Sequence, residues 1–256
     1  MDPATAGVGF LGGLLIGLTG MAGGTVVTPL LIYVVDIKAV TAVGTNLVFA
    51  AVTKLLGAWQ HGQQGTVDRQ TALRLATGSL PGALIGVGLV ELASRYGRGD
   101  PDEVMRQVLG YTLLIVAASL LVFTVVTLRR QTAARLRLGA RQRTVATVAI
   151  GAVVGILVGF TSVGSGSLLV PFLLVAYPFG AATVVGTDVL HGALLSGVAA
   201  TGHIAVGNVD WSLLPSLLVG SVPGIIIGSR LAPVVPERAM RSALSGVLLF
   251  MGTRLI

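Results

Sequence analysis

Two long stretches of this chain contain no charged residue, and they limit the possible folds more than any other feature. Residues 107–128 and 144–178 have no Asp, Glu, Lys or Arg. A helix needs about 20 predominantly apolar residues to cross the hydrocarbon core of a bilayer. Over the whole chain 54% of residues are hydrophobic and only 11% are charged, whereas a soluble domain carries about 25% charged residues. The sequence therefore predicts an all-α polytopic membrane protein.

The chain also repeats itself. Sliding the sequence by 142 residues aligns 13–86 with 155–228 without a gap, and 25 of these 74 positions are identical. The identities include prolines, histidines and aspartates, which a shared bias toward Gly, Leu and Val would not align. We therefore expect two homologous halves, residues 1–128 and 144–256, joined by a basic linker at 129–143.

Each half is expected to contain a broken or re-entrant helical segment followed by three transmembrane helices. The apolar segments 5–35 and 145–177 are too long for one simple helix, and each is interrupted by a glycine-rich break. The transmembrane helices are predicted at 39–60, 69–93, 104–128, 181–203, 211–230 and 238–256.

The orientation of the halves has two solutions. If each interrupted segment crosses the membrane once, the repeats are parallel, and if each dips in and returns, they are inverted. With the linker on the cytoplasmic side, inversion also places Arg230, Arg238 and Arg241 there. Because cytoplasmic loops are enriched in Lys and Arg, the basic residues favour inversion.

The two breaks form the predicted anion site. Glycine lets the chain turn and exposes backbone N–H groups, and a helix N-terminus in a low dielectric attracts oxyanions without Lys or Arg. Broken helices that meet near the midplane are a recurrent way to build transporter sites. The alternative is that the glycines are packing notches or plain turns. The expected substrate-binding residues here are Gly20, Gly23, Gly24, Thr25, Gly164, Ser165, Gly166 and Ser167.

A second constellation lies inside the following helices. Thr45, Asn46 and Thr187 can add hydrogen bonds to a bound anion. Asp188 is an ionisable group within an apolar span, where such residues mark ion or proton paths. His191 is three residues further on and shares its helix face. Asp188 and His191 are therefore predicted to couple transport to a proton gradient, or else to form a structural pair that ties helices together.

Three further polar residues have less specific roles. Lys54 can line the pathway, pair with Asp188 or snorkel to the interface, and snorkelling is preferred because the helix ends near Gln60. His61 and His203 are expected to make interfacial hydrogen bonds. No His or carboxylate cluster has metal-ligand spacing, and no nucleotide-binding loop is present. We expect no cofactor, no metal and no nucleic-acid partner.

The ordered set of motifs, present in both copies, resembles the TauE/SafE (TSUP) family of sulfite exporters. The motifs are the first break with Pro29, the Ala-Val-Gly-Thr element at 42–45, the stretch from His61 to Asp68, and Gly78-Ser79 with Pro81-Gly82, and they return from Val163 to Gly224. The resemblance implies an integral membrane transporter for sulfur-containing anions such as sulfite, sulfoacetate or thiosulfate, in the cell membrane of a bacterium or archaeon.

Together these features predict a multi-pass protein of the cell (inner) membrane that exports small sulfur-containing oxyanions by alternating access, coupled to an ion gradient. Its partners would be the anion and the lipid bilayer, and a homo-oligomer is compatible with the sequence. The alternatives are an anion channel or a transporter of thiosulfate or small carboxylates. A membrane-embedded enzyme would need clustered nucleophiles, metal ligands or paired acids, so we predict that the protein is not an enzyme.

Overall fold

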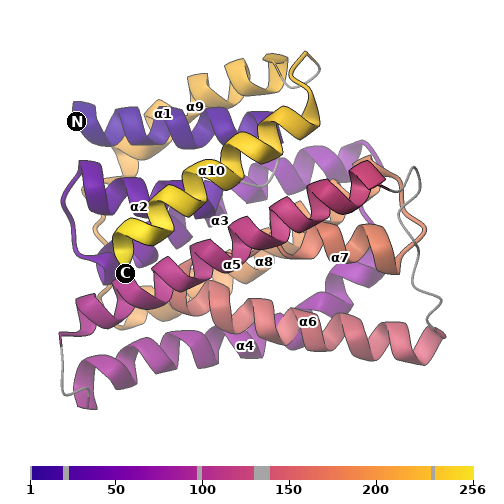
Figure 1. Cartoon of the computed structure of the whole chain (residues 1–256). Helices are drawn as coiled ribbons and strands as arrows, with labels where there is room; N and C mark the ends of the chain where they lie inside the picture. Colours follow the sequence, from indigo (N-terminus) through magenta and orange to yellow (C-terminus); the bar gives the residue numbers. More distant parts are fainter. Residues whose placement is uncertain (1, 20–22, 97–99, 130–138, 232–233) are drawn as a thin grey trace.

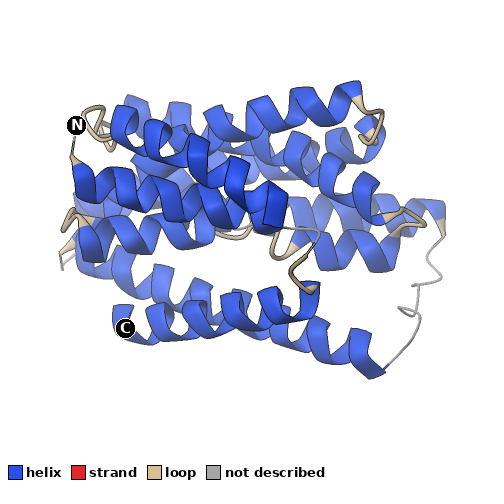
Figure 2. Ribbon diagram, turned by 90° about the horizontal axis from the view of Figure 1, so that it is seen from above, coloured by secondary structure: helices blue, strands red, loops and turns tan. Residues whose placement is uncertain are grey.

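The computed structural model of the chain describes residues 2–19, 23–96, 100–129, 139–231 and 234–256. These residues form helices and loops without a strand (Figure 2), which confirms the all-α prediction. The helices are α1 (Pro3–Thr19), α2 (Gly23–Val34), α3 (Ala39–Gln63), α4 (Arg69–Tyr96), α5 (Pro101–Arg129), α6 (Ala140–Thr161), α7 (Leu169–Ala176), α8 (Ala181–Ala205), α9 (Leu214–Leu231) and α10 (Glu237–Leu255).

Six of the helices in the described part of the chain, α3, α4, α5, α6, α8 and α9, are long and apolar enough to cross a membrane. The predicted span 238–256 corresponds to α10, which is not among the six; it carries three arginines in 19 residues. Helix α6 takes its place, because the uncharged stretch before the second break is long enough to cross by itself. The predicted linker 129–143 is shorter, since α6 already begins at Ala140.

The helices pack as pairs around a central crossing. The most extensive contacts join α4 to α6 and α1 to α9, followed by α3 to α8 and α5 to α10. In Figure 1 the α1–α9 pair lies at the top, the α4–α6 pair lies at the bottom, and α5 and α10 cross the front. Helices α3 and α8 lie between these pairs, where Leu47, Phe49 and Leu195 are fully buried.

Helices α1 and α6, which the 142-residue shift of the sequence aligns, run in opposite directions. In Figure 1, α1 begins at the left end of the bundle and α6 at the right end. The last turn of α5 and the first turn of α6 lie at the same end of the bundle as the last turn of α9 and the first turn of α10, whereas the last turn of α4 and the first turn of α5 lie at the other end. Opposite directions are what the inverted alternative expects, and the repeat itself stays a prediction.

Glycines allow the outer helix pairs to approach at backbone distance. A Cβ atom added at Gly13 would lie 2.3 Å from the carbonyl oxygen of Ser221, and one added at Gly155 would lie 2.2 Å from that of Ser79. The two contacts are separated by the same 142 residues that relate the sequence copies. Small residues at such crossings let backbones pack closely, which drives helix association in lipid.

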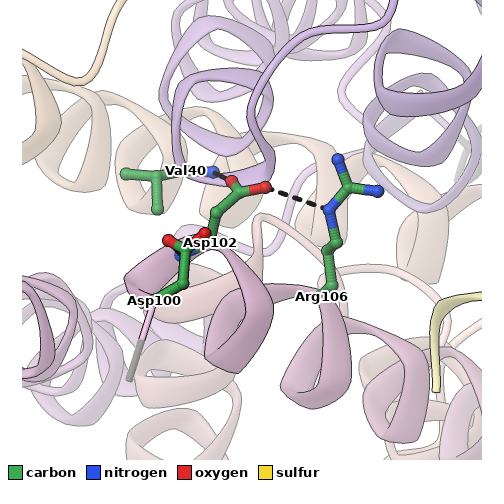
Figure 3. Close-up of polar contacts among 4 residues, drawn as sticks. All are labelled: Val40, Asp100, Asp102 and Arg106. Atoms are coloured by element: carbon green, nitrogen blue, oxygen red, sulfur yellow. Dashed lines mark hydrogen bonds and ion pairs between the residues drawn. The ribbon is translucent and has the colours of Figure 1, made fainter. Parts of the chain in front are cut away.

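A polar contact fixes the start of α5 against α3. The Asp102 carboxylate accepts a hydrogen bond from the Val40 amide at 3.3 Å and pairs with Arg106 Nε at 2.9 Å (Figure 3). Asp102 and Glu103 also lie in the first turn of α5, where negative charge is favourable at the positive end of the helix dipole. The contact joins the start of α3 to the start of α5.

The glycine contacts predict a selective loss of stability. Gly155→Ala forces a methyl group against the Ser79 carbonyl and should cost about 1–3 kcal/mol, the usual cost of overpacking. The control Gly197→Ala, in the interior of α8, meets no atom within 4 Å and should leave stability equal or higher. Thermal unfolding in detergent measures both, and equal midpoints would contradict the close packing of α4 and α6.

Candidate functional site

The second break is an irregular segment buried within the helices. Helix α6 ends at Thr161, and α7 begins at Leu169. Ser162 adopts the left-handed region with φ 61°, and Gly164 and Gly166 have φ of 122° and 70°. The break therefore begins two residues earlier than predicted, because Ser162 rather than a glycine reverses the chain. Irregular backbone at membrane depth needs polar partners from the protein or water.

Two charged side chains from different helices supply such partners. Lys54 Nζ on α3 donates to Ser165 Oγ at 2.6 Å, and the Gly166 amide donates to Asp188 Oδ1 on α8 at 3.0 Å. The two side chains bond to neighbouring residues of the break, although no direct ion pair joins them in the described structure. A cation and a carboxylate thus hold two consecutive residues of the break, with balanced charge.

The preference for a snorkelling Lys54 is wrong. The ammonium turns toward the break instead of toward the interface, because Gly192 on α8 leaves a groove for it. A Cβ atom added at Gly192 would lie 2.7 Å from Lys54 Nζ and 3.1 Å from Cδ. Gly192 therefore determines which way the Lys54 side chain points, and Gly192 lies far from Lys54 in the sequence.

A cluster of hydroxyl and amide groups joins the first broken segment to the second. Thr28 Oγ1 on α2 and Ser162 Oγ lie 2.6 Å apart, and Asn46 Nδ2 donates to both oxygens at 2.8 and 3.1 Å. Asn46 and Asp188 occupy equivalent positions of the duplication, and both side chains bond to the second break. Neither Thr28 nor Ser162 was singled out from the sequence, where a lone hydroxyl residue in an apolar run carries no specific signal.

The other residues expected in the first break lie beside this cluster. Gly23 and Gly24 form the start of α2, and Thr25 is buried in its first turn. Gly20 lies outside the described residues. Since Thr28 is one turn after Thr25, the structure brings the start of α2 against the second break.

Thr45 and Thr187 lie away from the breaks and stabilise the connections between helices. Thr45 Oγ1 accepts from the Asp210 amide at 2.9 Å, and Thr187 Oγ1 accepts from the Asp68 amide at 3.0 Å. Each hydroxyl therefore holds the loop that precedes a helix of the other half. Both side chains are fully buried.

Two buried polar atoms in the predicted site have no hydrogen-bond partner among the described residues. They are Ser167 Oγ, just before α7, and His191 Nδ1 on α8. The other ring nitrogen of His191, Nε2, lies 2.7 Å from Ser79 Oγ on α4. No hydrogen bond joins His191 to Asp188, so the two residues share a helix face but contact different partners.

A cavity of about 390 Å³ is lined in part by Lys54 and by no residue of the break. A single water occupies about 30 Å³ in the liquid, so the cavity has room for an anion of several heavy atoms. Its walls come from the ends of α1, α3 and α9 and the first half of α8. The polar side chains in the wall are Thr19, Thr53, Lys54, Gln60, His61 and Ser229.

The two end histidines differ. His61 lines this cavity and its Nδ1 lies 2.8 Å from Thr66 Oγ1. His203 is fully buried, and its Nε2 lies 2.8 Å from the Gly159 carbonyl oxygen. In the described chain no group of three or more His, Cys, Asp or Glu could hold a metal ion.

Comparison with known proteins identifies the family. Residues 5–255 match the family model described as Sulfite exporter TauE/SafE. The chain belongs to the TauE/SafE family. This TauE/SafE protein is accordingly a membrane transporter and not an enzyme, and the resemblance inferred from the motifs is confirmed.

Several relatives of this TauE/SafE protein carry transporter names. The probable membrane transporter protein YjnA of Bacillus subtilis is 35% identical over 97% of both chains. The probable membrane transporter protein YdhB of the same organism is 27% identical over 92% of both. The probable membrane transporter protein MJ0441 of Methanocaldococcus jannaschii is 22% identical over 96% of this chain and 91% of its own. No solved structure matches this TauE/SafE protein.

The contact between the broken segments can be tested by cross-linking, because the chain has no cysteine of its own. The combination Thr28→Cys with Ser162→Cys should form a disulfide on oxidation, since the two hydroxyl oxygens lie 2.6 Å apart and a disulfide needs Cβ atoms about 3.5–4.5 Å apart. A protease site inserted between residues 130 and 138 separates the halves for non-reducing electrophoresis. Each single-cysteine variant is the control, and halves that separate without reductant would contradict the contact.

Proposed function

We propose that this protein exports small sulfur-containing oxyanions, such as sulfite, sulfoacetate or related organosulfonates, across the cell membrane. It acts as a secondary transporter coupled to an ion gradient. The family description names a sulfite exporter, which supports the substrate class. The observation that carries the proposal is the position of Lys54, whose side chain lines the cavity while its ammonium bonds to Ser165 in the break.

The cavity supplies entry, and Lys54 supplies the charge. An anion that enters from the ends of α1 and α9 meets the ammonium of Lys54, beyond which lies the buried break. A charge-assisted hydrogen bond in a low dielectric is worth more than one in water. The hydroxyls and amides of the two breaks, Gly20 to Thr25 and Gly164 to Ser167, would complete the coordination as the anion moves past Lys54.

Alternating access would follow from movement of the two halves against each other. The breaks lie where α2 meets the second broken segment, and the outer pairs α1–α9 and α4–α6 each combine helices from both halves. Such broken helices at a repeat interface allow one group of helices to rock around a fixed central site. Asp188, buried on α8 beside this site, would couple the movement to protons, and His191 on the same helix face is the other candidate for the proton.

Replacing the cation tests the proposal. Lys54→Gln removes a charge-assisted hydrogen bond worth about 1.5–3 kcal/mol, so we expect anion affinity to fall between about ten- and about a hundredfold. Flux of labelled sulfite and sulfoacetate into proteoliposomes measures the effect.

The chain provides a matched control for this variant. Lys38, the only other lysine in the sequence, is exposed at the start of α3, and Lys38→Gln should leave flux unchanged. Equal flux in wild type and Lys54→Gln would remove Lys54 from the path, and wild-type protein that moves no sulfur anion under any gradient would refute the substrate class.

A further inference from the structure

The break at Gly164 to Ser167 already contacts a negatively charged group, the carboxylate of Asp188. A bare amide cradle was expected at Gly164 to Ser167, but the Gly166 amide donates to the Asp188 carboxylate at 3.0 Å. Asp188 is almost completely buried. A transported anion therefore does not meet an empty cradle beyond Lys54, because a resident negative charge already occupies part of it.

The charges of the site leave no room for a second anion while Asp188 is ionised. Lys54 balances Asp188 in a region where an uncompensated buried charge is expensive. Adding a singly charged anion would leave two negative charges beside one positive charge. Adding a proton together with the anion would keep the charges balanced, because Lys54 then balances the transported anion while Asp188 is neutral.

Asp188 has an oxygen that can receive this proton. Oδ1 accepts the hydrogen bond from Gly166, and Oδ2 makes no hydrogen bond to a described residue. Protonation at Oδ2 would leave the bond from Gly166 to Oδ1 in place, so the break can keep its shape while its charge changes.

We infer that ionised Asp188 balances the charge of Lys54 when no transported anion is bound, a role we call the counter-anion role. Protonation of Asp188 leaves the Lys54 charge available to the transported anion, so that one proton and one anion bind together and cross in the same direction. This inference rests on the proposed function. The bond formed is O–H on Asp188, and no covalent bond of the transported anion changes. Export then requires the outward gradient of the anion to exceed any inward gradient of protons, and an acidic exterior drives the anion inward.

The surroundings of Asp188 offer few other titratable groups. Lys54 faces it from α3, and His191 follows one turn later on α8 with Nε2 against Ser79 of α4. Asp68 precedes α4, and its carboxylate accepts from the Thr71 amide at the start of that helix. The charged residues of α6 are Arg141 and Arg143 in its first turn, at the opposite end from the break, and α7 carries none.

Proton uptake on anion binding tests the inference. Methanesulfonate, an organosulfonate with a single negative charge, stays fully ionised across the neutral range, so it brings no proton of its own. Added to detergent-solubilised protein in a weak buffer with a pH dye, it should cause uptake of about one proton per bound anion. Calorimetry should show affinity falling about tenfold for each pH unit above the titration of Asp188, because the competent fraction falls by that factor.

Four variants test where the proton binds and what Lys54 contributes. Asp188→Asn keeps an oxygen for the Gly166 amide but cannot titrate, so binding should persist without proton uptake and without pH dependence. His191→Gln should keep both. Gly192→Ala pushes the Lys54 ammonium aside and should weaken binding while retaining proton uptake, whereas Gly197→Ala on the same helix meets no neighbour and should change neither.

The failures are distinguishable. If wild-type protein binds no methanesulfonate, sulfoacetate or sulfite at any pH, the proposed function fails. If it binds the anion without proton uptake, or releases a proton, the function stands and the counter-anion role is wrong. Loss of proton uptake in His191→Gln but not in Asp188→Asn would move the proton to the histidine and also overturn the inference.

Discussion

An interrupted helix in an apolar environment has to find partners for its free backbone groups, and the rest of this structure depends on how that need is met. Between Thr161 and Leu169 the chain has no regular helix. Asp188 from α8 takes one amide of this segment, and Lys54 from α3 takes a neighbouring hydroxyl. Placing the two charges near each other lowers the cost of burying Asp188 completely and Lys54 in part. The central crossing of α3 and α8 therefore positions the two charged side chains of the site and also forms the centre of the fold.

The packing around this crossing explains why so many glycines are present. Glycines at the α1–α9 and α4–α6 contacts bring backbones together, which keeps the outer pairs narrow. Gly192 serves a different purpose, because it leaves space for the Lys54 side chain. In the duplication, Lys54 corresponds to Ser196 and Asp188 to Asn46. The two copies thus share a scaffold, while the pair of charges belongs to one break only.

The sequence predicts the helices well and the contacts poorly, for a physical reason. Uncharged apolar runs and glycine-rich breaks are local signals, and they place α3, α5 and α8 within a few residues. Asp188 is recognisable from the sequence because a carboxylate within an apolar span is energetically costly and marks a functional position. The direction of Lys54 depends on Gly192, more than 100 residues away, and the bond between Thr28 and Ser162 depends on tertiary packing. The pairing of His191 with Ser79 has the same origin, since it joins α8 to α4.

The central claim is that Lys54 and Asp188 hold the break as a balanced pair. A thermal-unfolding cycle in detergent with Lys54→Gln, Asp188→Asn and the combined variant measures it most directly. Lys54→Gln leaves the buried Asp188 charge unbalanced and should lose about 3–5 kcal/mol. Asp188→Asn leaves the half-buried Lys54 charge unbalanced and should lose less. The neutral double variant should recover much of the larger loss. Losses that simply add in the double variant would contradict the pairing of the two charges.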